Sequence, residues 1–362
     1  MKLGIVGLPN VGKTTLFNAL TGSKAEAASY AFSTVTPNVG IVKVPDERLD
    51  YLAELYEPKK YTPATIEFVD IAGLAKGASR GEGLGNKFLD KIRQTDALVQ
   101  VVRCFDNDDL FEERADAARD VEALNLELIL ADIEIMERRV ERTEKLAKVG
   151  DKKAKQELSF FTGLLAHLSE GKPARSFDME DADPAFLNDG GLLSLKPVIY
   201  AANLDEDGIA DYEADPNYRA LCAIAQAEGA KVLPIDAQLE QEIFDMDPEE
   251  RQMFLDDFGI RESGLAHLIR ESYDLLGYIS FLTCGKDEVR AWTIVRGTKA
   301  PKAAGKVHTD IERGFIRANI IAFEDLKSCG SEAAAKEKGL LRSEGKEYVM
   351  QDGDVTHFMF NV

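Results

Sequence analysis

The sequence has few cysteines and no long hydrophobic run. Its four cysteines are widely scattered, so their spacing indicates neither a disulfide framework nor a metal site and suits a reducing compartment. No apolar stretch is long enough to span a membrane, and no signal peptide precedes the first motif. From these absences we expect a cytoplasmic protein without a membrane partner.

Positive charge is also scarce, because 44 lysine and arginine residues face 64 aspartate and glutamate residues, for a net charge of −20. A chain this acidic does not bind nucleic acid over its whole surface. No DNA partner is therefore expected, and any contact with RNA must be local. The 362 residues are enough for two or three domains with a sizeable core.

The start of the chain carries the strongest functional signal. An apolar strand at residues 2–6 leads into Gly7-Leu8-Pro9-Asn10-Val11-Gly12-Lys13-Thr14, the phosphate-binding pattern G-x-x-x-x-G-K-T, and helical spacing follows. In such a loop backbone N–H groups face phosphate oxygens, Lys13 reaches the β- and γ-phosphates, and the Thr14 hydroxyl ligates Mg²⁺. The full motif in this setting disfavours the alternative, a glycine-rich turn with a surface lysine. The predicted nucleotide-binding residues here are Asn10, Val11, Gly12, Lys13, Thr14 and Thr15, with Lys13 also catalytic.

A second nucleotide motif follows the predicted strand at residues 65–70. Asp70-Ile71-Ala72-Gly73 fits D-x-x-G, in which the acid holds Mg²⁺ and the glycine N–H approaches the γ-phosphate. We therefore predict Asp70 as a metal residue and Gly73 as a catalytic one, although D-x-x-G alone is more often a turn. The glycine-rich residues 77–85 are interpreted as a switch ordered by triphosphate, or alternatively as a flexible surface loop.

The middle of the chain changes from strand to helix spacing. Apolar residues recur at three- and four-residue steps over 121–148, and a second helix follows the turn at Gly150-Asp151, which together predict an antiparallel helical hairpin. Strands resume at 197–202 and 231–235, and the latter leads to Ala237, a further predicted nucleotide-binding residue. Beyond these, the pattern predicts short strands at 289–295, 315–322 and 355–360.

The predicted fold class is α/β. We expect a P-loop doubly wound sheet interrupted by the helical hairpin and followed by a small β-grasp module. The corresponding boundaries are 1–120 with 196–276 for the nucleotide-binding domain, 121–195 for the hairpin and connector, and 277–362 for the C-terminal domain.

Charge is distributed unevenly between these parts. From Gly277 onward, 13 lysine and arginine residues nearly balance 12 aspartate and glutamate residues, so the rest of the chain carries the negative excess. The basic residues of this part are either a solvated face or a contact for RNA. Within this part, a basic cluster is formed by Lys299, Lys302, Lys306, His308, Arg313 and Arg317.

Together these motifs resemble the YchF group of Obg-related P-loop NTPases, over essentially the whole chain. The resemblance rests on the P-loop, on Phe32-Ser33-Thr34 with Pro37-Asn38, on Asp70-Ile71-Ala72-Gly73-Leu74, and on Asn203-Leu204-Asp205-Glu206. It also covers the helical insertion and a C-terminal stretch that is similar to a TGS domain. The resemblance implies Mg²⁺ ligation by Thr14 and Thr34, ATPase activity, and ribosome or ribosomal RNA binding through the TGS-like and helical domains.

The chain departs from the family where hydrolysis is concerned. The resemblance implies a histidine in the loop after the strand that ends near Val102, and residues 105–118 contain none. Leu74 also stands where Ras-type enzymes place a water-orienting glutamine, so low intrinsic turnover is expected. Related NTPases with an asparagine at position 10 use it to help hold K⁺, and Asn10 here either does so or only hydrogen-bonds the loop.

The preferred nucleotide base is predicted from the motif Asn203-Leu204-Asp205-Glu206. Guanine-specific NTPases have Asn-Lys-x-Asp there, and the aspartate accepts two hydrogen bonds from guanine. Here Leu204 can pack on a purine, but Glu206 is one methylene longer than aspartate and should miss the guanine edge. We therefore predict ATP binding in preference to GTP, with Asn203, Leu204 and Glu206 in the base pocket.

The predicted function is a ribosome-associated, Mg²⁺-dependent NTP-hydrolysing switch in translation or stress regulation. The alternatives are a nucleotide-sensing binding protein whose hydrolysis is incidental, and a switch that prefers GTP. A P-loop small-molecule kinase fits poorly, because the Asn203 motif and the TGS-like module have no place in one.

Overall fold

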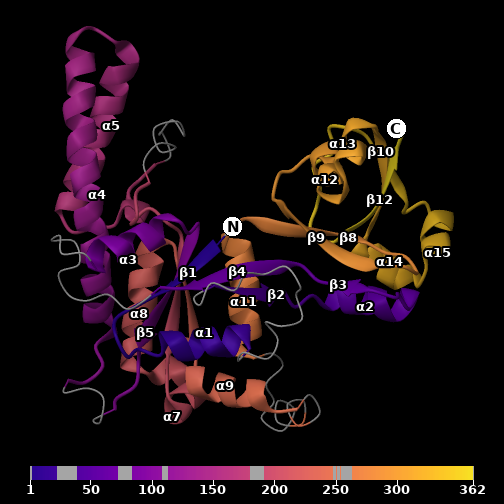
Figure 1. Ribbon diagram of the computed structural model, residues 1–362, viewed down its shortest axis with the longest axis horizontal. Coiled ribbons are helices and arrows are strands. Elements are labelled where there is room, and N and C mark those ends of the chain that lie inside the picture. The colour runs from indigo at the N-terminus through magenta and orange to yellow at the C-terminus, as the bar shows by residue number, and fades with distance from the viewer. Residues whose placement is uncertain are drawn as a thin grey trace. The chain divides into compact units, whose positions relative to one another are not determined.

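The structure is a computed structural model that describes residues 2–22, 39–71, 84–107, 113–179, 191–247, 250, 253 and 263–361 (Figure 1). By their contacts, residues 1–40 with 67–268 form one compact unit, called here the first unit. Residues 41–66 with 269–362 form the second unit. The three-part domain boundaries predicted from the sequence remain a proposal.

One six-stranded sheet has the order β2-β4-β1-β5-β6-β7. Its strand β1 lies parallel to β4 and β5, β5 lies parallel to β6, and β6 lies parallel to β7. Every residue of β5 and β6 is buried, as expected for central parallel strands that are covered on both faces. The strands are β1 (Lys2–Val6), β2 (Val39–Lys43), β4 (Thr65–Asp70), β5 (Ala97–Arg103), β6 (Val198–Asn203) and β7 (Lys231–Ile235).

Helices accompany this sheet, which confirms the predicted α/β P-loop fold. Buried side chains of β5 and β6 share one hydrophobic core with residues of α3, α4 and α8. The helices are α1 (Lys13–Thr21), α3 (Leu84–Arg93), α4 (Ala117–Lys148), α5 (Lys152–Ser169), α7 (Glu206–Ala210), α8 (Pro216–Glu228), α9 (Ala237–Asp245) and α11 (Gly264–Leu275), with 3-10 turns η3 (Ala174–Ser176) and η4 (Tyr212–Ala214).

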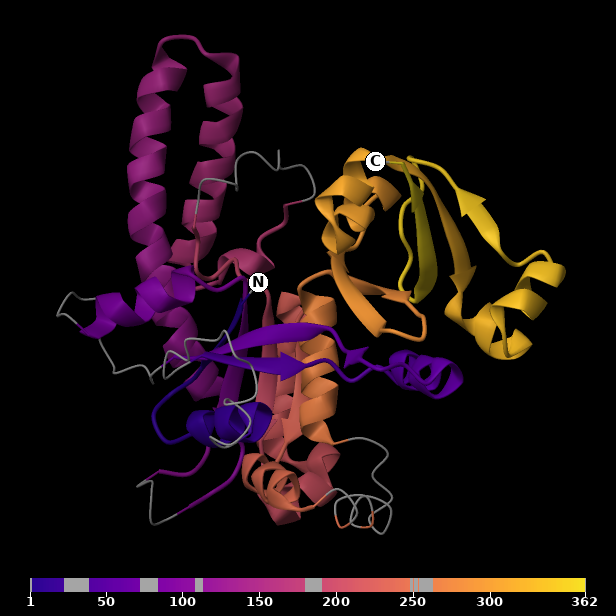
Figure 2. The same cartoon turned by 45° about the vertical axis from the view of Figure 1, so that its right-hand side comes forward.

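The predicted helical hairpin is present as α4 and α5, which run side by side as an arm of the first unit (Figures 1 and 2). The first helix begins at Ala117, four residues before the apolar spacing predicts, because Asp116 caps it by accepting from Arg119 N. Apolar residues of both helices, including Met136, Phe161 and Leu164, form their own core. Within the described ranges, no helix combines the length and hydrophobicity needed to cross a bilayer.

A buried aspartate fixes the base of the hairpin. Asp132 of α4 is fully buried and accepts hydrogen bonds from Leu193 N at 2.7 Å and from Ser194 N at 2.7 Å. The Ser194 hydroxyl donates a third at 2.6 Å. Burial raises the pKa of Asp132, and these three donors oppose the shift. The carboxylate thereby fastens the arm to the connector that leads into β6.

The second unit contains a sheet of order β11-β10-β12-β8-β9-β3. The predicted strands at 289–295, 315–322 and 355–360 are confirmed, whereas the sequence pattern missed β8, β11 and β3. The strands are β3 (Tyr61–Thr62), β8 (Tyr278–Thr283), β9 (Val289–Val295), β10 (Phe315–Ala322), β11 (Arg342–Glu344) and β12 (Asp354–Phe360). The helices are α2 (Glu47–Tyr56), α12 (Ala300–Val307), α13 (Thr309–Arg313), α14 (Phe323–Cys329) and α15 (Glu332–Glu337).

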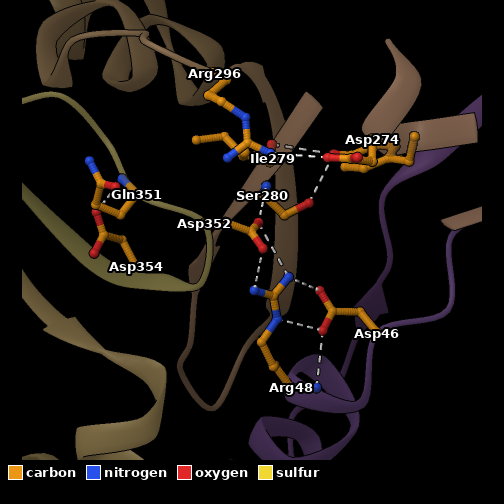
Figure 3. Close-up of polar contacts among 10 residues, drawn as sticks. Asp46, Arg48, Asp274, Ile279, Ser280, Arg296, Gln351, Asp352 and Asp354 are labelled. Carbon is orange, nitrogen blue, oxygen red and sulfur yellow. Dashed lines mark hydrogen bonds and ion pairs between the residues drawn. The ribbon is translucent and has the colours of Figure 1, made fainter. Parts of the chain in front are cut away.

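Residues 41–66 join the second unit through a short strand and an ion-pair network. Strand β3 pairs parallel with β9. Arg48, in the first turn of α2, donates from Nη1 to Asp352 Oδ2 at 2.8 Å and from Nε to Asp46 Oδ1 at 2.8 Å (Figure 3). Asp352 Oδ1 also accepts from Ser280 N at 2.8 Å. Burial lowers the pKa of Arg48, but the two carboxylates outweigh burial and raise it above its usual range.

Replacing Arg48 with methionine is expected to lower the free energy of unfolding of the second unit by about 1–3 kcal/mol, because two carboxylates lose a shared donor. Fluorescence of Trp292, the single tryptophan, reports unfolding of this unit in urea. Lys59→Met is the matched control. It breaks the Lys59–Asp287 pair, whose side chains are 80% and 90% exposed, and should change stability by less than about 0.5 kcal/mol. Equal effects of the two substitutions would contradict the role of Arg48.

Candidate nucleotide-binding site

The P-loop connects the carboxyl end of β1 to the first turn of α1, in the predicted strand–loop–helix arrangement. Gly12 has φ 96°, and a Cβ there would clash with Asn203 Nδ2. A Cβ at Gly7 would lie 2.5 Å from the Val101 carbonyl oxygen. Asn10 also adopts a left-handed conformation, with φ 63°, and its side chain is exposed. The glycines are therefore required by close backbone approach as well as by conformation.

Lys13 supplies a buried cation to this loop. Its side chain is 7% exposed, and Nζ donates to the Leu8 carbonyl oxygen at 2.5 Å. Burial lowers the pKa of Lys13, and attraction to Asp70 opposes the shift. An ammonium group removed from water interacts strongly with any anion that can replace the carbonyl. The position suits contact with phosphate oxygens.

Asp70 and Thr14 bring two oxygen ligands together beside Lys13. Thr14 Oγ1 donates to Asp70 Oδ2 at 3.4 Å. The other carboxylate oxygen, Asp70 Oδ1, is buried and has no hydrogen-bond partner within the described part of the chain. Burial raises the pKa of Asp70, and attraction to Lys13 opposes that shift. A hydroxyl and an unsatisfied carboxylate oxygen are hard ligands that fit Mg²⁺.

Asn203, at the end of β6, holds the P-loop through its side-chain amide. Its Nδ2 donates to the Val11 carbonyl oxygen at 2.9 Å, and its Oδ1 accepts from Ala237 N at 3.0 Å. Asn203 is 6% exposed and Ala237 is 2% exposed. The structure thus brings together Val11, Asn203 and Ala237, which the sequence predicted separately. The bracing role was not predicted, because it depends on the pairing of β6 with its neighbours.

The remaining residues of the base motif face different surroundings. Leu204 is 2% exposed and belongs to the hydrophobic core, so its side chain offers a purine almost no surface. Asp205 caps α7 by accepting from Gly208 N at 2.8 Å. Glu206 is exposed as the first residue of α7.

Arg103 is a buried residue near the site that sequence reasoning missed. It lies opposite Asn203 in the β5–β6 register and is 3% exposed. Its Nη2 donates to the carbonyl oxygens of Glu113 and Arg114, both at 3.1 Å, and so holds the loop that follows β5. A basic residue at the carboxyl end of an apolar strand was the available signal. Thr34 and Gly73 lie outside the described residues, as does most of the predicted switch segment.

The basic cluster predicted in the second unit is partly neutralised. Lys302 Nζ lies 2.6 Å from Glu312 Oε1, and Lys299 Nζ lies 2.6 Å from Glu347 Oε2. His308 lies 3.4 Å from Asp310 Oδ2. Three members of the cluster therefore have acidic neighbours, which weakens their attraction for phosphates.

Known proteins are similar to this chain over essentially its whole length. Residues 2–145 match a family model described as "50S ribosome-binding GTPase", and residues 278–361 match the model YchF-GTPase_C, described as a protein of unknown function. The chain is 52% identical over 361 residues to the "Ribosome-binding ATPase YchF" of Bacillus subtilis, covering 99% of each chain. It is 49% identical to the protein of that name from Escherichia coli O157:H7, covering 100% of this chain and 99% of the relative.

A solved structure has the same fold throughout. The Schizosaccharomyces pombe YchF GTPase superimposes with a TM-score of 0.88 at 37% identity, covering 99% of this chain and 97% of that one. The bacterial relatives are named as ATPases and the yeast protein as a GTPase. These names therefore do not decide between adenine and guanine nucleotides.

Proposed function

The chain belongs to the YchF family of Obg-related P-loop nucleoside triphosphatases, and from this premise we propose a Mg²⁺-dependent ATPase that binds ribosomes according to its bound nucleotide. The observation that carries the proposal is the buried Lys13 ammonium beside the Thr14–Asp70 pair. Relatives named for ribosome binding, similar over their full length, support the choice of partner. With such a partner, the proposed place of action is the cytoplasm and the proposed role is in translation or stress regulation.

Different residues of the site would contact the phosphates and the Mg²⁺ ion of a bound triphosphate. Lys13 would exchange the Leu8 carbonyl for phosphate oxygens, and the loop N–H groups would receive the remaining charge. Thr14, Thr34 and Asp70 would hold Mg²⁺, which supplies neutralisation of the phosphate charge when bound. The N–H of Gly73 is proposed to approach the γ-phosphate. Asn203 and Ala237 keep the loop in place for these contacts.

Hydrolysis without a partner should be slow, because Leu74 has no polar atom with which to orient water. We propose K⁺ as an additional cation near Asn10, whose exposed side chain lies in the loop that receives the phosphates. Equal rates of hydrolysis in KCl and NaCl would contradict this assignment.

Stimulation of turnover by ribosomes supports a switch. Nucleotide-dependent binding without stimulation supports a sensor whose hydrolysis is incidental.

The preference for adenine rests on Glu206. Guanine recognition needs a carboxylate that accepts from N1–H and the amino group together, and adenine presents a bare N1 acceptor that a carboxylate in that position would repel. Glu206 is exposed at the start of α7, and its extra methylene displaces the carboxylate from the guanine edge. The displacement therefore removes two effects on binding: the hydrogen bonds that favour guanine, and the repulsion of N1 that disfavours adenine.

We expect the non-hydrolysable ATP analogue to bind more tightly than the GTP analogue by about 1–3 kcal/mol, or roughly 5- to 150-fold in Kd. Glu206→Asp should reduce this ratio, because it returns the carboxylate toward the guanine edge. Asp207→Glu, at the neighbouring exposed position, changes the side chain by one methylene as well and should leave the ratio unchanged. Isothermal titration of the two analogues measures the ratio, and tighter binding of the guanine analogue would refute the preference.

A further inference from the structure

Positive charge is concentrated at the end of the helical hairpin. The hairpin tip, defined as residues 145–155, carries five lysines and a single acidic residue in a chain whose net charge is −20. All five lysines are exposed. The tip therefore has a local charge opposite to that of the protein as a whole. Its lysines are Lys145, Lys148, Lys152, Lys153 and Lys155.

The lysines on the two helices of the tip differ in their ion pairing. Lys145 and Lys148, in the last turn of α4, pair with Glu141 at 2.7 Å and with Glu144 at 2.9 Å. These positions also suit the negative end of a helix. By contrast, the ammonium groups at the start of α5 form no ion pair or hydrogen bond with any described residue. They belong to Lys152, Lys153 and Lys155.

The unpaired lysines work against the helix that carries them. The first turn of α5 contains no acidic residue, and its lysines face the positive end of the helix dipole. The Asp151 cap alone offsets this, by accepting from Lys153 N and Ala154 N. Residues that oppose local stability without gain inside the fold point to a role outside it.

Apolar side chains are exposed between these charges. Val149 is 86% exposed and Leu146 is 49% exposed, beside the turn at Gly150, which has φ 98°. The tip therefore presents two apolar contacts flanked by free ammonium groups. Lysines with such neighbours suit a surface that offers dense negative charge together with sugar or base edges. In the basic cluster of the second unit, Lys299 and Lys302 are instead held by glutamates.

We propose that the hairpin tip docks on the phosphodiester backbone of ribosomal RNA. The lysines at the start of α5 contact phosphates, and Val149 with Leu146 packs against exposed sugars or bases. The inference rests on the proposed ribosome binding, and it locates within the helical hairpin the residues that meet RNA. An acidic ribosomal protein would be the other kind of surface, and the experiment separates the two.

The first test is charge reversal at the start of α5, as the triple variant K152E/K153E/K155E. Glutamates there favour the helix N-terminus, so the variant should fold. In co-sedimentation with purified ribosomes at several salt concentrations, affinity is expected to fall at least tenfold. A plot of log affinity against log salt has a negative slope, and its magnitude should decrease by about two to three, as for the loss of three phosphate contacts.

The matched control is K286E/K338E/K346E, which makes the same charge change at exposed lysines of the second unit and should retain affinity and slope. Basal ATP hydrolysis should be unchanged in both variants. If the α5 variant binds like the unmodified chain, the tip inference is overturned and ribosome binding stands. If the unmodified chain does not sediment with ribosomes, the proposed function falls and the inference falls with it.

The second test identifies the surface. Iron–EDTA attached to Val149→Cys should cleave ribosomal RNA at a few discrete positions, since the tip lies against RNA. Glu170→Cys, at the opposite end of α5, should not produce those cuts, and the labelled unmodified chain corrects for the native cysteines. Absence of cuts from position 149, with the affinity loss of the triple variant intact, would assign the tip to an acidic protein and overturn the RNA proposal.

Discussion

Lys13→Ala is expected to lower ATP turnover by at least about 100-fold, since loss of one hydrogen-bond donor that stabilises transition-state charge already costs about 10²–10³ in rate. The expectation follows from the burial of the ammonium group, which makes its interaction with phosphate strong and leaves no solvent to replace it. Nucleotide affinity should fall with turnover. Titration with the ATP analogue and a phosphate-release assay measure the two effects.

Lys2→Ala is the control for Lys13. Lys2 belongs to the same strand–loop–helix segment, but its side chain is 48% exposed and its pairing with Glu67 spans 3.6 Å. Its removal should leave affinity and turnover unchanged. If Lys13→Ala behaves like Lys2→Ala, the assignment of the P-loop fails.

Asp70→Asn is expected to lower Mg²⁺-dependent turnover by about 10- to 100-fold, as is typical when a group supporting a bound metal is replaced. The amide keeps the shape of the carboxylate but not its charge. It should not lower the free energy of unfolding, because burial already disfavours the charged carboxylate, as the raised pKa of Asp70 indicates. Turnover and urea stability measured on one preparation therefore separate a metal role from a structural one. A parallel loss of stability would contradict the metal role.

The P-loop and the hairpin could be predicted because each is carried by neighbouring residues. Gly12 and Lys13 belong to one short motif with a fixed backbone requirement, and the apolar spacing of α4 extends over many turns. The attachment of residues 41–66 to the second unit could not be predicted in this way. It depends on the two-residue strand β3 and on the Arg48–Asp352 pair, whose members lie 304 positions apart.

The base motif shows a finer limit of prediction from sequence. The sequence places Asn203, Leu204 and Glu206 within four positions, and pattern alone assigns them to one pocket. Alternation along the end of β6 turns Leu204 into the core while Asn203 bonds the P-loop, and α7 begins only at Glu206. The direction of each side chain is set by the strand end and by the Asp205 cap, which no motif encodes.

The central claim is that bound nucleotide controls ribosome binding, and co-sedimentation with purified ribosomes in three nucleotide states tests it most directly. The full chain is compared with the non-hydrolysable ATP analogue, with ADP and without nucleotide. We expect the triphosphate state to bind at least about tenfold more tightly than the ADP state, within the usual range of coupling between two sites. Equal affinity in all three states would contradict it.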